Sequence, residues 1–203
     1  ILSGIIGFIL GIIAGIKEGK LIDKIIRGYC YIIMSTPTFW LGILFIILFS
    51  VKLGWFPVAL SVPIGVLSEN VGFVERMQHI ILPALTLSII SISSICMNTR
   101  QKVIEIMESD YILFAKARGE SQISIIFNHV LKNVSLPAIT LQFLSFSELF
   151  GGTIFVEQVF SYPGLGQATV SAGLKGDLPL LMGIAIISLV FVYSGNIIAD
   201  LLY

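Results

Sequence analysis

The sequence predicts an all-α protein that crosses a membrane several times. Of its 203 residues, 56% are hydrophobic and only 12% are charged, and the mean hydropathy is +1.00. A soluble domain carries about 25% charged residues, so this chain has too few charges to coat a water-facing surface of its size. Its formal net charge is zero, so the sequence lacks the excess of cations that would indicate a nucleic-acid partner.

Five apolar runs are candidates for membrane-spanning helices. A helix needs about 20 apolar residues to cross roughly 30 Å of hydrocarbon, and it satisfies its own backbone hydrogen bonds there. The first run begins at residue 1, so we expect the chain to lack an earlier span of a longer protein. We assign one transmembrane domain over residues 1–203, with spans at about 1–16, 28–51, 80–97, 134–151 and 179–202.

The connections between these runs differ in charge. Segments 17–27 and 98–133 carry four and five cations, whereas segments 52–79 and 152–178 carry two and one. Cytoplasmic connections carry an excess of Lys and Arg. We therefore expect segments 17–27 and 98–133 in the cytoplasm and the other two connections outside.

Segment 98–133 is predicted to form three short helices. The first continues the preceding span through residues 100–108, and the third covers residues 122–133. The middle helix, residues 111–118, has Ser109 or Asp110 as its N-cap and Gly119 directly after its last turn. It is apolar but too short to cross a membrane, so either the protein's own bundle or a groove on a partner must cover it. The sequence leaves both possibilities open.

Five stretches carry a family resemblance. Residues 110–119, DYILFAKARG, resemble the cytoplasmic loop of ABC-importer membrane subunits, in the branch that handles dipeptides, oligopeptides and nickel complexes. Further similarity to this branch occurs, in the same order, at residues 35–42, 53–57, 129–137 and 156–166, and the last of these stretches is the most specific.

One position departs from the family pattern. Where that family has a Glu-Ala-Ala triplet ahead of its glycine, this chain has Leu113-Phe114-Ala115. No role for a triplet glutamate is therefore carried over to this chain.

The resemblance implies the fold of a type I ABC importer permease, with six spans in the complete protein, in the inner membrane of a bacterial cell. Such a subunit forms half of a translocation path for peptides or for nickel and metal-chelate complexes. The implied partners are a second homologous permease, two ABC ATPase subunits, an extracellular substrate-binding lipoprotein and the lipid bilayer. The chain has no GxxxxGK[ST] loop, so we expect no enzyme activity and no bound cofactor or metal, with ATP and Mg used by the ATPases.

The resemblance also implies two sets of site residues. The first set would couple the protein to the ATPases through the cytoplasmic helix, and the second would line the translocation path or its outer gate. The coupling residues are Asp110, Tyr111, Leu113, Phe114, Ala115, Ala117, Arg118, Gly119 and Glu120. The path or gate residues are Glu148, Glu157, Phe160, Tyr162, Pro163 and Gly164.

Other membrane functions are weaker alternatives. A stand-alone secondary carrier usually shows internal repeats and coupling-ion acids, and a channel subunit needs a pore-lining motif or a ring of like charges. An intramembrane hydrolase needs paired catalytic groups within its spans, which Glu148 alone does not supply. The substrate itself cannot be identified from the sequence.

Overall fold

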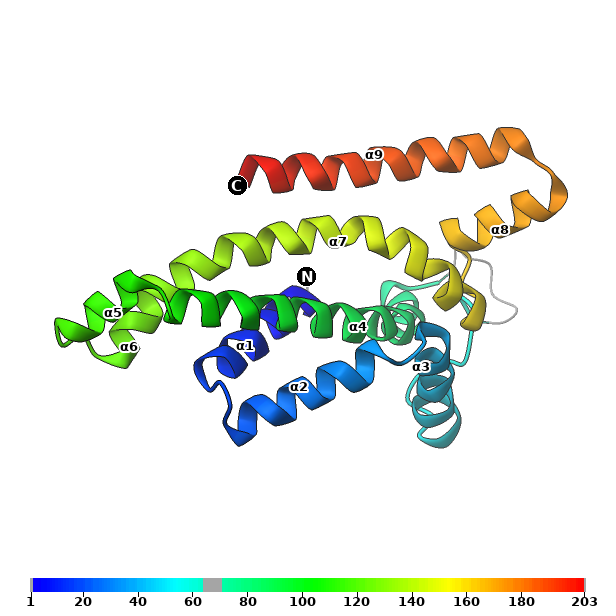
Figure 1. Ribbon diagram of the computed structural model, residues 1–203. Coiled ribbons are helices and arrows are strands. Elements are labelled where there is room, and N and C mark those ends of the chain that lie inside the picture. Colours follow the sequence, from blue (N-terminus) through cyan, green and yellow to red (C-terminus); the bar gives the residue numbers. More distant parts are fainter. Residues whose placement is uncertain (1, 64–70, 203) are drawn as a thin grey trace. The chain divides into compact units, whose positions relative to one another are not determined.

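The computed structural model describes residues 2–63 and 71–202, with the side chains of residues 145–152 and 202 outside the description. Every regular element in those ranges is helical, so the predicted all-α class is confirmed. Figure 1 traces the helices in chain order. They are α1 (Leu2–Ile16), α2 (Leu21–Met34), α3 (Thr38–Phe45), the π-helical η1 (Ile46–Lys52), α4 (Phe73–Met107), α5 (Asp110–Ala117), α6 (Gln122–Ile125), the π-helical η3 (Ile126–Val130), α7 (Leu131–Val159), α8 (Leu165–Lys175) and α9 (Leu178–Leu202).

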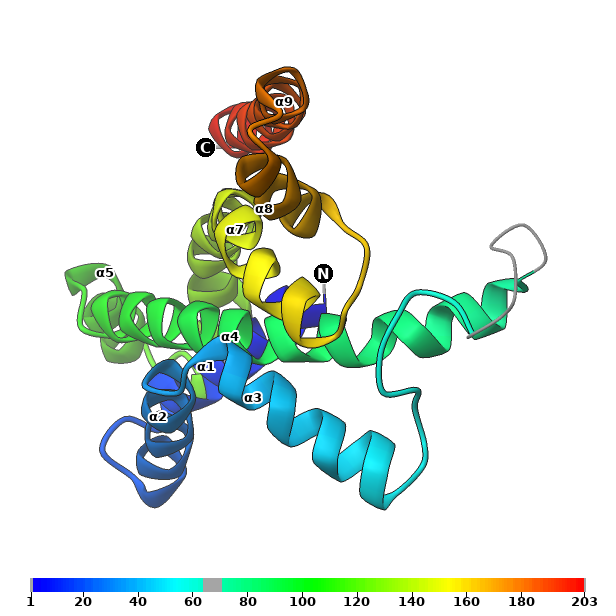
Figure 2. The ribbon, with the colours of Figure 1, turned by 90° about the vertical axis from the view of Figure 1, so that its right-hand side faces the viewer.

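The chain forms two compact units. The first consists of Ile1–Ser35, Ile90–Ser145 and Gly195–Tyr203, and the second of Thr36–Ile89 and Phe146–Ser194. The predicted cytoplasmic segments belong to the first unit. In that unit α5 follows the C-terminal end of α4, as both ribbon views show (Figures 1 and 2).

Two described helices, α4 and α9, are long and apolar enough to cross a membrane. A third crossing results if α2 and the pair α3–η1 form one broken span, since the chain leaves the helical path between Met34 and Thr38. Pro37 lies at this break in an extended conformation, as the N-cap residue of α3. The break falls inside the span that we expect over 28–51. The helix α1 is shorter than a full span, and α7 contains the undescribed side chains, so the number of five spans stays a prediction.

Segments predicted as connections are partly helical. Helix α2 begins at Leu21, inside the predicted connection 17–27, and α7 and α8 occupy much of segment 152–178. The third cytoplasmic helix does not stop at Asn133 but continues through η3 into α7. The extensions of α2 and α7 share one cause: an apolar run marks the part of a helix that can lie in hydrocarbon, whereas the helix itself continues into polar sequence. Helix α8 is instead a separate helix within its segment.

Helix α1 packs closely on α4 through glycines on one face. A Cβ atom at Gly7 would lie 2.8 Å from the carbonyl oxygen of Ile92, and one at Gly11 would lie 2.7 Å from that of Cys96. A Cβ at Gly15 would meet Val103 at 2.6 Å. Small residues at helix interfaces in membranes let two backbones approach in this way.

Substitution of Gly11 by leucine is expected to push α1 away from α4, because a Cβ at this position would lie 2.6 Å from Cβ of Thr99. Overpacking of this kind costs about 1–3 kcal/mol, so the apparent melting temperature of the purified full-length protein should fall. Gly28→Leu in α2 is the matched control, since no described atom lies within 4 Å of a Cβ built there. Equal melting temperatures for the two variants would contradict the close packing.

Candidate functional site

Helix α5 has a defined start and a defined stop. Ser109 is its N-cap residue, in an extended conformation. Gly119 has a φ of +82°, which an L-residue with a side chain rarely adopts. The N–H of Gly119 donates to the carbonyl oxygen of Lys116 at 3.0 Å, and the N–H of Glu120 donates to that of Ala115 at 3.1 Å. This pair of bonds is a Schellman motif, so the predicted stop at Gly119 is confirmed.

One face of α5 lies in the core of the first unit. Ile112 and Ala115 are buried, and they belong to a cluster to which α4, α6, η3 and α7 also contribute. Side chains of α1 pack against the same cluster. The buried members are Val103, Ile112, Ala115, Ile125, Val130 and Val134, with Phe8, Ile12, Ile16, Ile106 and Met107 packed against them. The protein's own bundle therefore covers this face.

The opposite face of α5 is exposed in the described part of the chain. Leu113 and Phe114 are 53% and 64% exposed, and Asp110 and Ala117 are exposed on the same side. The guanidinium of Arg118 lies 5.9 Å from the ring centroid of Phe114. The sequence left open whether the bundle or a partner covers α5, and the structure shows that the bundle covers only one face.

Ala115 of the predicted coupling set lies on the buried face of α5. Its side chain is 5% exposed and packs in the core, and its role in coupling stays a prediction. With 3.6 residues per turn, Ala115 points about 100° away from its neighbour Phe114. The resemblance assigns a role to the segment, but it does not say which side of the helix each residue occupies.

Two further members of the coupling set connect α5 to the start of α7. Oε2 of Glu120 lies 3.1 Å from Nε2 of His129, and the rings of Tyr111 and His129 are 6.2 Å apart. The amide of Asn133 donates to the hydroxyl of Tyr111 at 3.4 Å and to the carbonyl oxygen of His129 at 2.7 Å. These contacts, together with the apolar cluster, fix α5 to the helices on which it rests.

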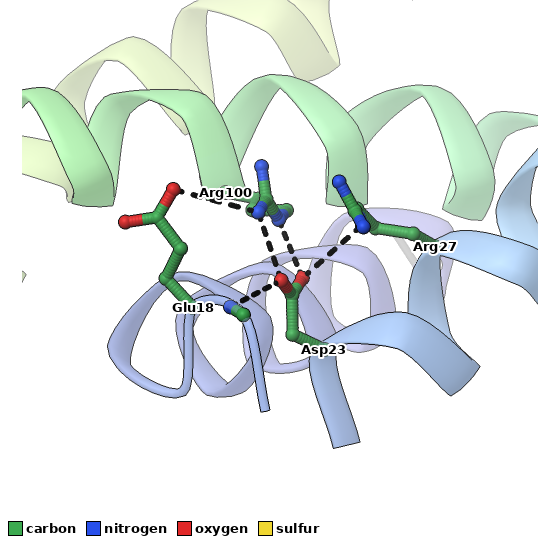
Figure 3. Close-up of polar contacts among 5 residues, drawn as sticks. Glu18, Asp23, Arg27 and Arg100 are labelled. Carbon is green, nitrogen blue, oxygen red and sulfur yellow. Dashed lines mark hydrogen bonds and ion pairs between the residues drawn. The ribbon is translucent and has the colours of Figure 1, made fainter. Parts of the chain in front are cut away.

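A buried ion pair joins Asp23 and Arg100 in the same unit (Figure 3). The carboxylate of Asp23, at 0% exposure, accepts from Nε of Arg100 at 2.6 Å and from Nη2 at 2.9 Å. The N–H of Gly19 donates to Oδ2 of Asp23 at 2.9 Å. Nε of Arg27 lies 3.7 Å from Oδ1, and the carboxylate of Glu18 lies 3.8 Å from Arg100. A bidentate Arg–carboxylate pair is among the strong polar contacts in proteins, and this pair joins the start of α2 to α4.

Sequence reasoning missed this ion pair. It counted Arg27 and Arg100 only as cations of cytoplasmic connections and gave Asp23 no role. The two partners are 77 positions apart, so no local pattern connects them. The available signal was an acid next to two apolar runs, where a buried charge needs a partner.

Four of the predicted gate residues come together in the second unit. Oε2 of Glu157 accepts from the N–H of Gln167 at 2.7 Å, in the first turn of α8. Gly164 precedes α8 and leaves room for this carboxylate. Phe160 is buried in an apolar cluster, against which Tyr162 packs.

The other two gate residues are placed only in part. Pro163 is exposed. Glu148 lies within α7, but its side chain is outside the described residues. Lining of a path by any of these six residues stays a prediction.

Residues 7–203 match the family described as binding-protein-dependent transport system inner membrane component. This chain belongs to that family. It is 34% identical over 203 residues to the oligopeptide transport system permease protein AppB of Bacillus subtilis, covering 100% of this chain and 63% of that protein. It is 32% identical over 216 residues to the di/tripeptide transport system permease protein DppB of Pseudomonas aeruginosa, covering 99% and 64%. The dipeptide transport system permease protein DppB of Escherichia coli is 30% identical over 216 residues, covering 98% and 64%.

The family confirms the resemblance noted in the sequence, and it confirms that the chain is an inner-membrane component. The named relatives are permeases of peptide transport systems. The chain spans less than two thirds of the length of these relatives.

Asp23→Asn is expected to destabilise the full-length permease strongly, because Arg100 would remain buried without its counter-charge. Removal of one partner from a buried pair costs about 3–5 kcal/mol. Glu18→Gln is the matched control, since this half-exposed carboxylate only approaches Arg100 at 3.8 Å, and weak exposed pairs contribute at most about 1 kcal/mol. Thermal unfolding in detergent measures both variants. A smaller loss for Asp23→Asn than for Glu18→Gln would contradict this ranking.

Proposed function

We propose that this chain is the permease subunit of an ATP-driven importer for peptides, and that α5 is the helix through which ATPase subunits act on it. Family membership and the peptide permeases among its relatives support the transport role. The single observation that carries the coupling role is the division of α5 into a face held in the core and an exposed face with Leu113 and Phe114.

The contacts of α5 suit it for transmitting a displacement. Its buried face touches residues of α4 and α7 through the shared cluster, and the Glu120–His129 contact holds its exit. A push on the exposed face therefore reaches two long helices without first bending α5. Movement of the ATPases between open and closed states would then shift the permease between inward-facing and outward-facing states. The size of this shift is limited by the difference in free energy with which the ATPases bind the two permease states.

The remaining partners follow from the same proposal. A second permease supplies the other half of the path, an extracellular binding protein delivers the substrate, and ATP and Mg are used by the ATPases. Nickel or metal-chelate complexes are the second substrate class, which the resemblance implies and none of the named relatives supports. A stand-alone carrier or a channel subunit is the competing function. Uptake by the full-length permease in vesicles that lack ATPases would favour the competing function and overturn the proposal.

Phe114→Ala is expected to lower ATP-dependent peptide uptake without unfolding the protein, because the side chain is largely exposed and contributes little to the core. Loss of an aromatic anchor at the centre of an interface costs about 2 kcal/mol or more, which corresponds to at least a 30-fold weaker ATPase contact. The measurement is peptide uptake by the reconstituted transporter, with copurification of the ATPases as a second readout.

Ile9→Ala is the control for Phe114→Ala, since Ile9 is similarly exposed but lies on α1. It should leave uptake and copurification unchanged. Ile112→Ala should instead lower the melting temperature, because Ile112 is buried in the core. Normal uptake and normal ATPase copurification with Phe114→Ala would exclude α5 as the coupling helix.

A further inference from the structure

Residues 17–24, which join α1 to the first turn of α2 and are called the α1–α2 turn here, separate their charged side chains by sign. The two acids, Glu18 and Asp23, both lie toward Arg100, and Asp23 is fully buried against it (Figure 3). Lys17, Lys20 and Lys24 are exposed. These three lysines make no ion pair with any residue that the structure describes.

This separation leaves the surface of the turn positive. Arg100 is buried and balances Asp23, so neither contributes to the exposed charge. Glu18 is the one exposed acid in the segment, against three exposed lysines. The sequence shows six charged residues over 17–27, and only the structure shows that the three lysines face outward whereas Arg27 lies toward Asp23.

Large apolar side chains adjoin the lysines on the outer side of α2. Leu21 and Ile25 are 72% and 62% exposed, and Ile32 continues the same side two turns on. Residues four and seven apart lie on one helical face. A helix with exposed apolar residues and flanking lysines is typical of the boundary between headgroups and hydrocarbon, where lysine stems lie along the apolar part and the ammonium groups reach the polar layer.

We propose that Lys17, Lys20 and Lys24 form a binding surface for anionic phospholipid headgroups. The positive charge of the lysines is complementary to the phosphate groups of lipids. The adjoining exposed side chains of Leu21 and Ile25 are suited to contact with acyl chains and less suited to a hydrated protein interface. The family places the chain in a membrane, and the bias of positive charge places this turn on the cytoplasmic side. The inference does not depend on the transported substrate or on the role of α5.

The test measures binding of phosphatidylglycerol to the delipidated full-length permease in detergent, by native mass spectrometry. A lysine at an anionic surface contributes about 1 kcal/mol, which is about fivefold in affinity. The triple variant K17Q/K20Q/K24Q should therefore bind phosphatidylglycerol up to about 100-fold more weakly, while its binding of phosphatidylcholine stays unchanged. Salt at about 0.5 M should weaken binding to the parent protein and have little effect on the triple variant.

The matched control is K102Q/K116Q/K132Q, which removes the same charge from residues 98–133, the other segment predicted to be cytoplasmic. Its affinity for phosphatidylglycerol should stay within about twofold of the parent. The lysines of the test variant are exposed and form no ion pair with the described residues, so its melting temperature should also match the parent. Unchanged affinity in the test variant, or an equal loss in both variants, would overturn the proposal. Loss of ATPase copurification with unchanged lipid affinity would show that the turn contacts a protein instead, and would also overturn it.

Discussion

A buried carboxylate determines how the first unit is assembled. Removal of an ion from water costs several kcal/mol, which is recovered only if good partners surround it. Asp23 has such partners in Arg100, Arg27 and the backbone of Gly19. This arrangement requires the turn after α1, the start of α2 and the C-terminal part of α4 to meet at one place. The glycine face of α1 makes this possible, since a Cβ at Gly15 would lie 3.1 Å from the carbonyl oxygen of Arg100 itself.

The same helices support α5. Val103 follows Arg100 by three residues on α4, contacts the glycine face of α1 and belongs to the cluster that buries Ile112. The Asp23–Arg100 ion pair and the apolar cluster therefore lie at successive turns of α4. A change in the position of α4 would act on both. Helix α5 therefore rests on elements that are joined by the Asp23–Arg100 ion pair and by close apolar packing.

Local patterns predicted much of this region, and long-range contacts account for what they missed. The alternation of apolar and charged segments gave the helical class, and Ser109 and Gly119 gave both ends of α5 because cap residues act within one turn. The Asp23–Arg100 pair joins residues 77 positions apart, and nothing in either neighbourhood requires the other. The burial of Ala115 could not be predicted in the same way, because its assignment came from a motif, which does not say which helical face a residue occupies. The contact of the Glu157 carboxylate with the first turn of α8 joins residues ten positions apart, and the sequence did not predict it.

The π-helical turn η3, between α6 and α7, contains one residue more per turn than an α-helix would. This extra residue acts as a spacer that sets the rotation of the preceding segment about the axis of α7. Loss of a single residue there would restore regular α-helical winding and rotate α6 by about 100°. His129 lies within η3, so its alignment with Glu120 depends on that spacer. The orientation of α5 thus depends on a local irregularity in helical winding, and deletion of one residue is enough to change it.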